Sequence, residues 1–280
     1  NANNISKFMG IFNGTSNFIL SKMTHEQTTF KDALEEAQRL GFAEADPTDD
    51  VEGVDAARKV VITSYLSFNQ VIKLNDVKLV GISDITLADI NAASALNYKI
   101  KLIGKGTYEN GYVNASVEPT LIHKNHQLAA VENEYNAIYV IGDAVGDTMF
   151  YGKGAGSLAT GSAVVSDLLN VALFFESNLH TLPPHFELKT EETKEMMDGA
   201  EPVVIQEKSN YYIVISHSHK SLEKVEYDIK KKLPFHKSLQ LVERDQDTYA
   251  IIVTGIETSP EKVLNQSGFN VKKVYPVEGV

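Results

Sequence analysis

Six acidic residues crowd twelve consecutive positions of the sequence, and a lysine follows four positions after the last of them. The acids are Glu44, Asp46, Asp49, Asp50, Glu52 and Asp55, and the lysine is Lys59. Residues four apart share one face of a helix, so the last acid and the lysine can form an ion pair. On a buried helix both groups are partly desolvated, which shifts the pKa of the lysine. The lysine can then serve as a proton donor. The aspartate would hold the lysine or bind a cationic group of a substrate.

Two other interpretations of the acidic stretch stay open. Acids near the first turn of a helix stabilise it by ~0.3 to 1 kcal/mol each, and this explanation suits Asp49, Asp50 and Glu52 best. A divalent metal is the second, but the spacing fails the Asp-x-Asp-x-Asp-Gly pattern of a calcium loop. Elsewhere, His217 and His219 are more typical of surface residues than of a metal site. We therefore predict no metal ligands in this chain.

A glycine-rich run is the other candidate for chemistry. It reads Gly152-Lys153-Gly154-Ala155-Gly156, and no glycine follows where a complete dinucleotide fingerprint needs its last one. The run can be a plain turn from a strand to a helix. Its backbone amides at a helix N-terminus can also hold a pyrophosphate or a carboxylate, and so complete a nucleotide site built mostly elsewhere.

Hydrophobic periodicity predicts the elements that position these groups. We expect an entry loop from residue 5, a helix that starts near Asn13 and ends near 25, and a second helix over 29–40 capped by Gly41. The segment 51–66 is apolar around most of its circumference, which is typical of a buried helix. Strands are expected within 95–141, with a turn at 109–111, and a helix over 158–175.

The composition changes near the two prolines at 183 and 184, and a Glu/Lys-rich patch follows. We predict a linker over 181–203 between a domain at 3–180 and a second domain at 204–280. The second domain has the order strand, helix, strand, strand, helix, strand, which is the ferredoxin-like pattern. The fold class is therefore α+β, with a mixed α/β domain followed by a βαββαβ domain.

Composition excludes several classes of protein. The chain of 280 residues carries 26 basic and 37 acidic residues, a net charge of −11, which argues against nucleic-acid binding. It has no cysteine, so disulfides, thiolate zinc sites and cysteine nucleophiles are absent. We find no apolar stretch of ~18 residues and expect no membrane contact. The sequence starts at Asn1 without methionine or signal peptide, so we expect a further domain upstream.

Three motifs resemble the catalytic region of homoserine dehydrogenase in order and spacing. They run from Gly10 to Leu20, from Gly41 to Lys59 and from Tyr151 to Gly156. The segment after the linker resembles an ACT domain, an appendage of enzymes of amino-acid biosynthesis. The two resemblances together cover nearly the whole chain.

The resemblance implies NAD(P)-dependent interconversion of L-homoserine and L-aspartate 4-semialdehyde, in the biosynthesis of threonine, isoleucine and methionine. Lys59 would donate the proton to the aldehyde oxygen. Glu44 and Asp55 would bind the substrate, with Asp50 in support. Gly14 and Thr15, next to Asn13, would line the substrate pocket, and Gly154 and Gly156 would approach the cofactor.

The family also carries a Rossmann domain, a further active-site lysine and most of a sodium-binding loop, which this sequence does not contain. We therefore expect the chain alone to bind NADP or NAD poorly and to turn over little. The resemblance also implies a cytoplasmic homodimer or higher homo-oligomer. The alternative function is that of a regulatory module whose ACT domain binds an amino-acid effector such as threonine and mediates oligomerisation.

Overall fold

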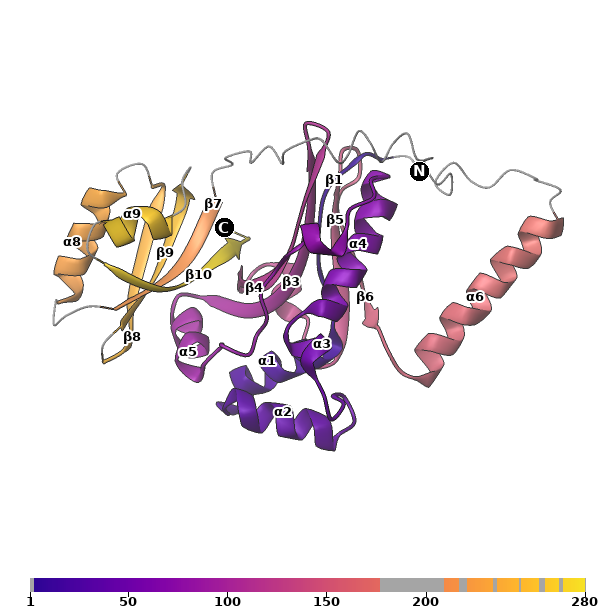
Figure 1. The fold of residues 1–280 in the computed structure, drawn as a ribbon, viewed down its shortest axis with the longest axis horizontal. Coiled ribbons are helices and arrows are strands. Elements are labelled where there is room, and N and C mark those ends of the chain that lie inside the picture. Colours follow the sequence, from indigo (N-terminus) through magenta and orange to yellow (C-terminus); the bar gives the residue numbers. More distant parts are fainter. Residues whose placement is uncertain are drawn as a thin grey trace.

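The computed structural model describes residues 3–176, 209–216, 221–233, 236–246, 248–256, 260–266 and 269–279. The predicted linker and the two histidines at 217 and 219 lie outside these ranges. Within them the chain forms a large mixed sheet with helices packed against it (Figure 1). The predicted α+β class is therefore confirmed.

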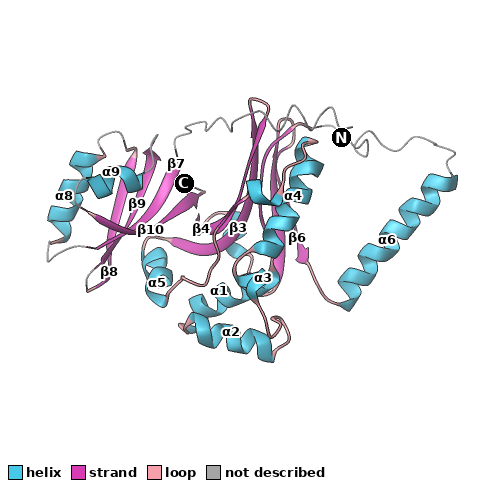
Figure 2. Cartoon of the chain, in the orientation of Figure 1, coloured by secondary structure: helices cyan, strands magenta, loops and turns pink. Residues whose placement is uncertain are grey.

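The first part of the chain alternates helices with strands. Its helices are α1 (Gly14–Glu26), α2 (Phe30–Arg39), α3 (Thr48–Val51), α4 (Val54–Phe68), α5 (Leu87–Ala95) and α6 (Ser157–Glu176), with 3₁₀ turns at Leu74–Asp76 and Gln127–Ala130. Its strands are β1 (Ile5–Ile11), β2 (Lys78–Leu79), β3 (Tyr98–Glu109), β4 (Tyr112–His123), β5 (Tyr135–Gly142) and β6 (Gly146–Lys153). Figure 2 shows α1 to α5 gathered beside the sheet, while α6 stands apart from it.

The sheet of the first part is antiparallel in the order β6-β5-β1-β3-β4, and the short β2 pairs in parallel with β4. The predicted turn at 109–111 closes the β3–β4 hairpin, where Asn110 and Gly111 both take positive φ, at 50° and 89°. This is the conformation that a two-residue hairpin turn requires. The turn prediction is thus confirmed.

Two glycines of β3 let the helices lie close to the sheet. A Cβ at Gly104 would lie 2.5 Å from Val60 of α4, and one at Gly106 would lie 2.4 Å from the ring of Phe8. The rings of Phe8 and Phe68 stack at 5.6 Å across the same space. Close packing of this kind fixes α4, and with it Asp55 and Lys59, against the centre of the sheet.

The C-terminal part follows the predicted element order. It comprises β7 (Ser209–Ser216), α8 (Leu222–Lys232), β8 (Ser238–Asp245), β9 (Thr248–Ile256), α9 (Pro260–Gln266) and β10 (Asn270–Glu278). The strands pair antiparallel in the order β10-β7-β9-β8. Val225 and Ile229 of α8 and Leu264 of α9 are fully buried in a core on this sheet. The predicted βαββαβ order is confirmed.

The two parts are joined through the sheet and through a buried ion cluster. The end of β10 pairs in parallel with β4, at Val277 with Leu121 and at Glu278 with Ile122. Asp89 of α5 is fully buried, and its two oxygens accept from Arg244 Nε at 2.8 Å and Lys273 Nζ at 2.7 Å. The two parts, which we expected to be two domains, therefore share one sheet and pack against each other.

Three expectations from the sequence are wrong. Residues 5–11 form strand β1 in the middle of the sheet and not an entry loop. The helix expected over 51–66 is broken at Gly53, whose φ of 81° no helix accommodates, so that α3 and α4 are separate. The outer side of α4 is also exposed, with Ile62 at 59% and Leu66 at 69% of their full accessibility.

A fourth correction concerns α6. By length and composition alone this helix could cross a membrane, although we expected no apolar stretch long enough. Its apolar side chains are exposed, among them Leu158, Leu168 and Phe175. The strand-to-helix turn that we predicted at the glycine-rich run does connect β6 to α6.

Candidate functional site

Asn13 connects two of the predicted acids. Its side-chain nitrogen donates to Asp50 Oδ1 at 2.6 Å and to Asp55 Oδ2 at 3.0 Å. Its side-chain oxygen accepts from the backbone nitrogen of Ser16 at 2.8 Å, which caps the N-terminus of α1. Because the cap fixes which end of the amide is the oxygen, the nitrogen must face the carboxylates. Asn13 therefore holds α1, α3 and α4 together at one point.

Lys59 lies beside this amide on α4. Its ammonium donates to Asp55 Oδ2 at 2.7 Å and to the backbone oxygen of Phe12 at 2.9 Å. The side chain of Lys59 is 45% exposed and that of Asp55 is 31% exposed. The predicted ion pair exists, and it is half open to solvent because the helix is covered on one side only. An ammonium held by a carboxylate and a carbonyl, with one side open, can present a proton to a bound molecule.

The other acids of the stretch have structural partners. Asp46 accepts from the backbone nitrogen and hydroxyl of Thr48 at the start of α3, and these hydrogen bonds lower the pKa of Asp46. Asp49 pairs with Arg58 at 2.5 Å, and Glu52 accepts from the hydroxyl of Ser83. Asp49 and Asp50 both lie in the first turn of α3, where the alternative interpretation expects stabilising acids, and Asp50 differs in that it also accepts a hydrogen bond from Asn13.

Glu44 lies on the loop that follows α2, and its side chain is exposed. The loop is tied down by its backbone, since Gln38 donates to the Glu44 carbonyl at 3.0 Å. Thr15 reaches the same loop, with its hydroxyl 2.6 Å from the Phe42 carbonyl. Over the described residues the structure gives no hydrogen bond or ion pair to the Glu44 carboxylate, so it does not join the Asn13 cluster directly.

Asn136 of β5 lies between the two predicted glycine sites. A Cβ at Gly14 would lie 3.3 Å from its side-chain oxygen and 2.6 Å from the Glu134 carbonyl. A Cβ at Gly154 would lie 2.7 Å from its side-chain nitrogen. The start of α1 and the glycine-rich turn are therefore neighbours, although 140 residues separate them in the sequence. Sequence reasoning missed Asn136, because nothing in the run of strand residues around it marks a functional position.

The glycine-rich turn is anchored on one side and open on the other. Lys153 pairs with Glu134 at 3.1 Å, which raises the pKa of Lys153, and its ammonium lies 5.4 Å from the centre of the Tyr135 ring. Gly156 has a φ of 111°, and no atom lies within 4 Å of the position of its missing Cβ. A ligand can thus approach the backbone at Gly156, next to the first turn of α6.

Comparisons with known proteins give the family of the chain. Residues 1–169 match the family model described as homoserine dehydrogenase, and residues 208–280 match the one described as homoserine dehydrogenase C-terminal domain. This chain belongs to the homoserine dehydrogenase family. The match to the first model spans β1 to α6 and so includes every residue of the predicted site.

Individual members of the family are closely similar. The homoserine dehydrogenase of Bacillus subtilis is 55% identical over 167 residues, which are 60% of this chain and 39% of that protein. The crystal structure of S. aureus homoserine dehydrogenase at pH 7.5 is 72% identical with a TM-score of 0.87, and covers 99% of this chain and 66% of that chain. A hyperthermophilic archaeal homoserine dehydrogenase mutant in complex with NADPH is 29% identical with a TM-score of 0.52, over 61% of this chain and 48% of that one. The chain thus spans two fifths to two thirds of these relatives.

Proposed function

We propose that this chain supplies the substrate half of an NAD(P)-dependent homoserine dehydrogenase, which interconverts L-homoserine and L-aspartate 4-semialdehyde. The observation that carries the proposal is the joint placement of Lys59, Asp55 and Asp50 around Asn13, in a chain of this family. The relatives that share this region are named homoserine dehydrogenases.

Lys59 is the proposed proton donor. In the reduction of the aldehyde, a hydride from NAD(P)H attacks the carbonyl carbon, and the carbonyl oxygen must gain a proton to become the hydroxyl of homoserine. Asp55 and the Phe12 carbonyl hold the Lys59 ammonium on one side, which directs its remaining proton outward. In the reverse direction the neutral amine accepts the proton from the homoserine hydroxyl.

The two aspartates bind the amino-acid part of the substrate in this proposal. Within the described residues both bonds to Asp55 end on Oδ2, and the bond to Asp50 ends on Oδ1. Each carboxylate therefore retains an oxygen for a substrate ammonium or hydroxyl. Glu44 would complete the pocket from its exposed position on the loop. Gly14 and Thr15 would line the pocket at the start of α1, next to that loop.

The cofactor is NADP or NAD, which supplies or accepts the hydride when bound. The turn at Gly154 and Gly156 fits one part of such a molecule, because the backbone at Gly156 is open and adjoins the start of a helix. In the described part of the chain no group of three or more His, Cys, Asp or Glu residues could hold a metal ion. A sodium ion in the longer enzyme remains an implication of the family resemblance.

Calorimetry tests the proposal directly. Titration of the chain with L-homoserine should give heat that Lys59→Met and Asp55→Asn abolish and that Lys31→Met, on the exposed face of α2, leaves unchanged. Titration with NADPH should give weak binding, and the chain alone should turn over little. Rapid turnover by this chain, or homoserine binding that survives both substitutions, would contradict the assignment.

The C-terminal part favours a second candidate function. Its element order and strand order are those of the ferredoxin-like pattern that ACT domains share, which supports binding of an amino-acid effector such as threonine. Threonine binding that disappears when the residues after 203 are deleted would support this function, and the absence of any heat would leave an oligomerisation role. We further propose a cytoplasmic homodimer or higher homo-oligomer in which protein, and not lipid, covers α6.

A further inference from the structure

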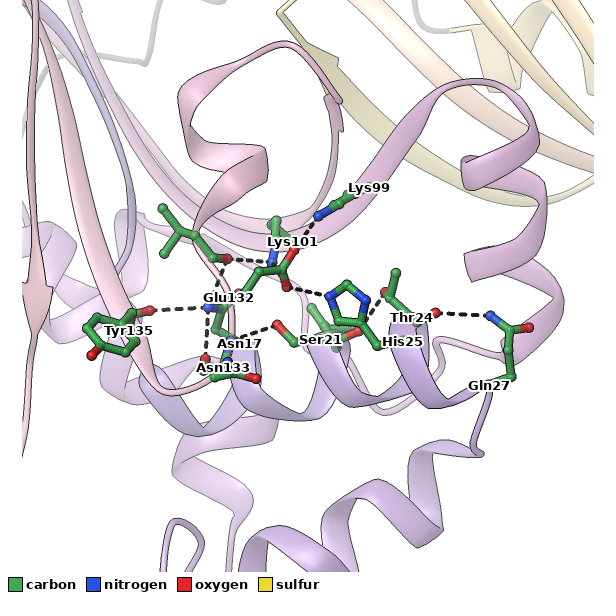
Figure 3. Close-up of polar contacts among 12 residues, drawn as sticks. Asn17, Ser21, Thr24, His25, Gln27, Lys99, Lys101, Glu132, Asn133 and Tyr135 are labelled. Carbon is green, nitrogen blue, oxygen red and sulfur yellow. Dashed lines mark hydrogen bonds and ion pairs between the residues drawn. The ribbon is translucent and has the colours of Figure 1, made fainter.

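Lys101 is a buried lysine that takes no part in the site described above. It lies on β3 with its side chain 2% exposed, and its ammonium donates to three acceptors. These are Asn17 Oδ1 at 3.0 Å, the Val131 carbonyl at 2.7 Å and Glu132 Oε2 at 3.3 Å (Figure 3). Every proton of the ammonium therefore has a partner, as a buried cation requires.

Glu132 supplies the opposite charge for this lysine. Its carboxylate also accepts from Lys99, which lies two residues earlier on β3, and it lies 3.4 Å from His25 Nε2. Only Lys101 of the two lysines also contacts Asn17 in the structure, as Figure 3 shows. The Lys101 network, defined here as Lys101, Glu132 and Asn17, thus connects β3, the loop before β5 and helix α1.

Asn17 extends the network along the backbone of that loop. Its side-chain nitrogen donates to the carbonyls of Val131 at 3.2 Å, Asn133 at 2.9 Å and Tyr135 at 3.2 Å. Because a lysine can only donate, the atom of Asn17 that faces Lys101 must be the oxygen, and the amide orientation is fixed. One side chain in the first turn of α1 therefore binds the backbone of residues 131–135 at three carbonyls.

These contacts lead to both halves of the candidate site. Upstream, Asn17 lies on the helix that begins with Gly14 and is capped by Asn13. Downstream, the loop that Asn17 holds continues directly into Asn136, which fills the space between Gly14 and Gly154. A displacement of the loop would thus alter the start of α1 and the glycine-rich turn together.

The two charges of the network affect the stability of the fold in opposite directions at neutral pH. Burial lowers the pKa of Lys101 to about 8 despite the Glu132 charge, which weakens the folded state. Burial opposes ionisation of Glu132 as well, but Lys101 and Lys99 outweigh it and hold the pKa of Glu132 at about 2, which strengthens the folded state. The two effects on stability are opposite in sign, as is common for buried ion pairs.

We propose that Lys101 and Asn17 are positioning residues, which hold the loop at 131–134 and the first residues of β5 so that Gly14 at the start of α1 lies beside the glycine-rich turn. This inference rests on the proposed function for the identity of the ligand, L-homoserine. It assigns no proton transfer to Lys101, whose ammonium is enclosed on all sides by protein acceptors.

A matched pair of variants tests the proposal. Lys101→Met keeps the unbranched apolar stem of the side chain and removes the ammonium with its donors, whereas Lys99→Met removes the neighbouring partner of Glu132 and leaves Asn17 untouched. Lys101→Met should weaken L-homoserine binding in calorimetry by about tenfold or more, because small displacements of a bound geometry are costly. Lys99→Met should stay within about twofold. Asn17→Asp, which keeps the volume and loses the amide donors, should behave like Lys101→Met.

The absence of cysteine allows a chemical rescue that separates charge from packing. Lys101→Cys, alkylated in denaturant and refolded, carries either an aminoethyl group or a propyl group at one site. The two side chains have the same length and differ in the ammonium. Aminoethylation should restore homoserine affinity to within about twofold of the parent chain, and propylation should not.

Hydrogen exchange tests the positioning role without any ligand. In Lys101→Met we expect faster exchange of the amides at 13–17 and 131–136, including Asn133, whose amide donates to Ser21 Oγ at 3.0 Å. Unchanged exchange there, or equal rescue by both alkyl groups, would overturn the positioning role. Unchanged homoserine affinity in a chain that binds homoserine would overturn it too. If the parent chain binds no homoserine, the proposed function fails, and the exchange pattern still decides whether Lys101 holds the loop.

Discussion

Acid should weaken the folded chain through Glu132, and the size of the effect follows from its surroundings. The carboxylate is 22% exposed and lies between Lys99 and Lys101, and its pKa falls from the ordinary 4.5 to about 2. A fall of that size corresponds to about 3 kcal/mol of folding free energy, at about 1.4 kcal/mol for each pKa unit. Because the pKa is lowered on folding, this stabilisation is present above pH 4.5 and is lost as the pH falls toward 2.

The comparison of the chain with Glu132→Gln measures this directly. The chain contains no tryptophan, so urea unfolding is followed by far-UV circular dichroism from pH 7 to pH 3. The difference in unfolding free energy between the two should shrink by about 2 kcal/mol over that range, while both lysines stay charged. Glu35→Gln on the exposed surface of α2 is the control. A difference that does not change with pH would refute the reasoning about Glu132.

Three further predictions concern packing, the junction between the two parts and the site. Gly104→Ala should lower the unfolding free energy by about 1 to 3 kcal/mol, because its Cβ would lie 2.6 Å from the Phe12 ring, whereas Gly152→Ala, with no atom within 4 Å, should change it by less than about 0.5 kcal/mol. Asp89→Asn should cost about 3 to 5 kcal/mol, since it removes the anion between two basic side chains, and should speed amide exchange in α5 and β8. Gly14→Ala should weaken homoserine binding by about tenfold, because its Cβ would lie 2.6 Å from a backbone carbonyl.

Each of these predictions has an outcome that contradicts it. Equal stability of the Gly104 and Gly152 variants would mean that β3 has room for a methyl group. Unaltered exchange in α5 and β8 after the Asp89 substitution would show that the ion cluster does not hold the two parts together. Homoserine affinity that is insensitive to Gly14→Ala would place the substrate away from the start of α1.

The sequence predicted elements whose own residues carry the signal. The helix expected at 29–40 is α2, with Thr29 as its N-cap, and Gly41 just beyond it takes the positive φ of 79° that the helix end requires. Asp55 and Lys59 were placed on one helical face by their spacing alone, and they do form an ion pair. The order of helices and strands in the C-terminal part could be predicted because each strand is a short apolar run between turn residues.

Other features depend on distant parts of the chain. Strand β1 was missed because its partners, β3 and β5, lie about a hundred residues away, and its own alternation of apolar and polar residues is weak. The break at Gly53 leaves the hydrophobic pattern intact and shows only in the backbone. Asn136 gains its place because Gly14 and Gly154, which are remote in the sequence, both lie beside it, and Lys101 resembles any exposed lysine of an alternating strand. Long-range packing decides β1, Asn136 and Lys101, whereas the break at Gly53 is a local property of the backbone.

Titration of the chain with L-homoserine, compared with the Lys59→Met chain, tests the central claim most directly. The account predicts measurable heat for the parent chain and none for the variant, since the ammonium held by Asp55 and the Phe12 carbonyl faces the substrate. Circular dichroism of both chains should coincide, because Lys59 is half exposed and contributes little to the core. Equal homoserine affinity in the two folded chains would contradict the account.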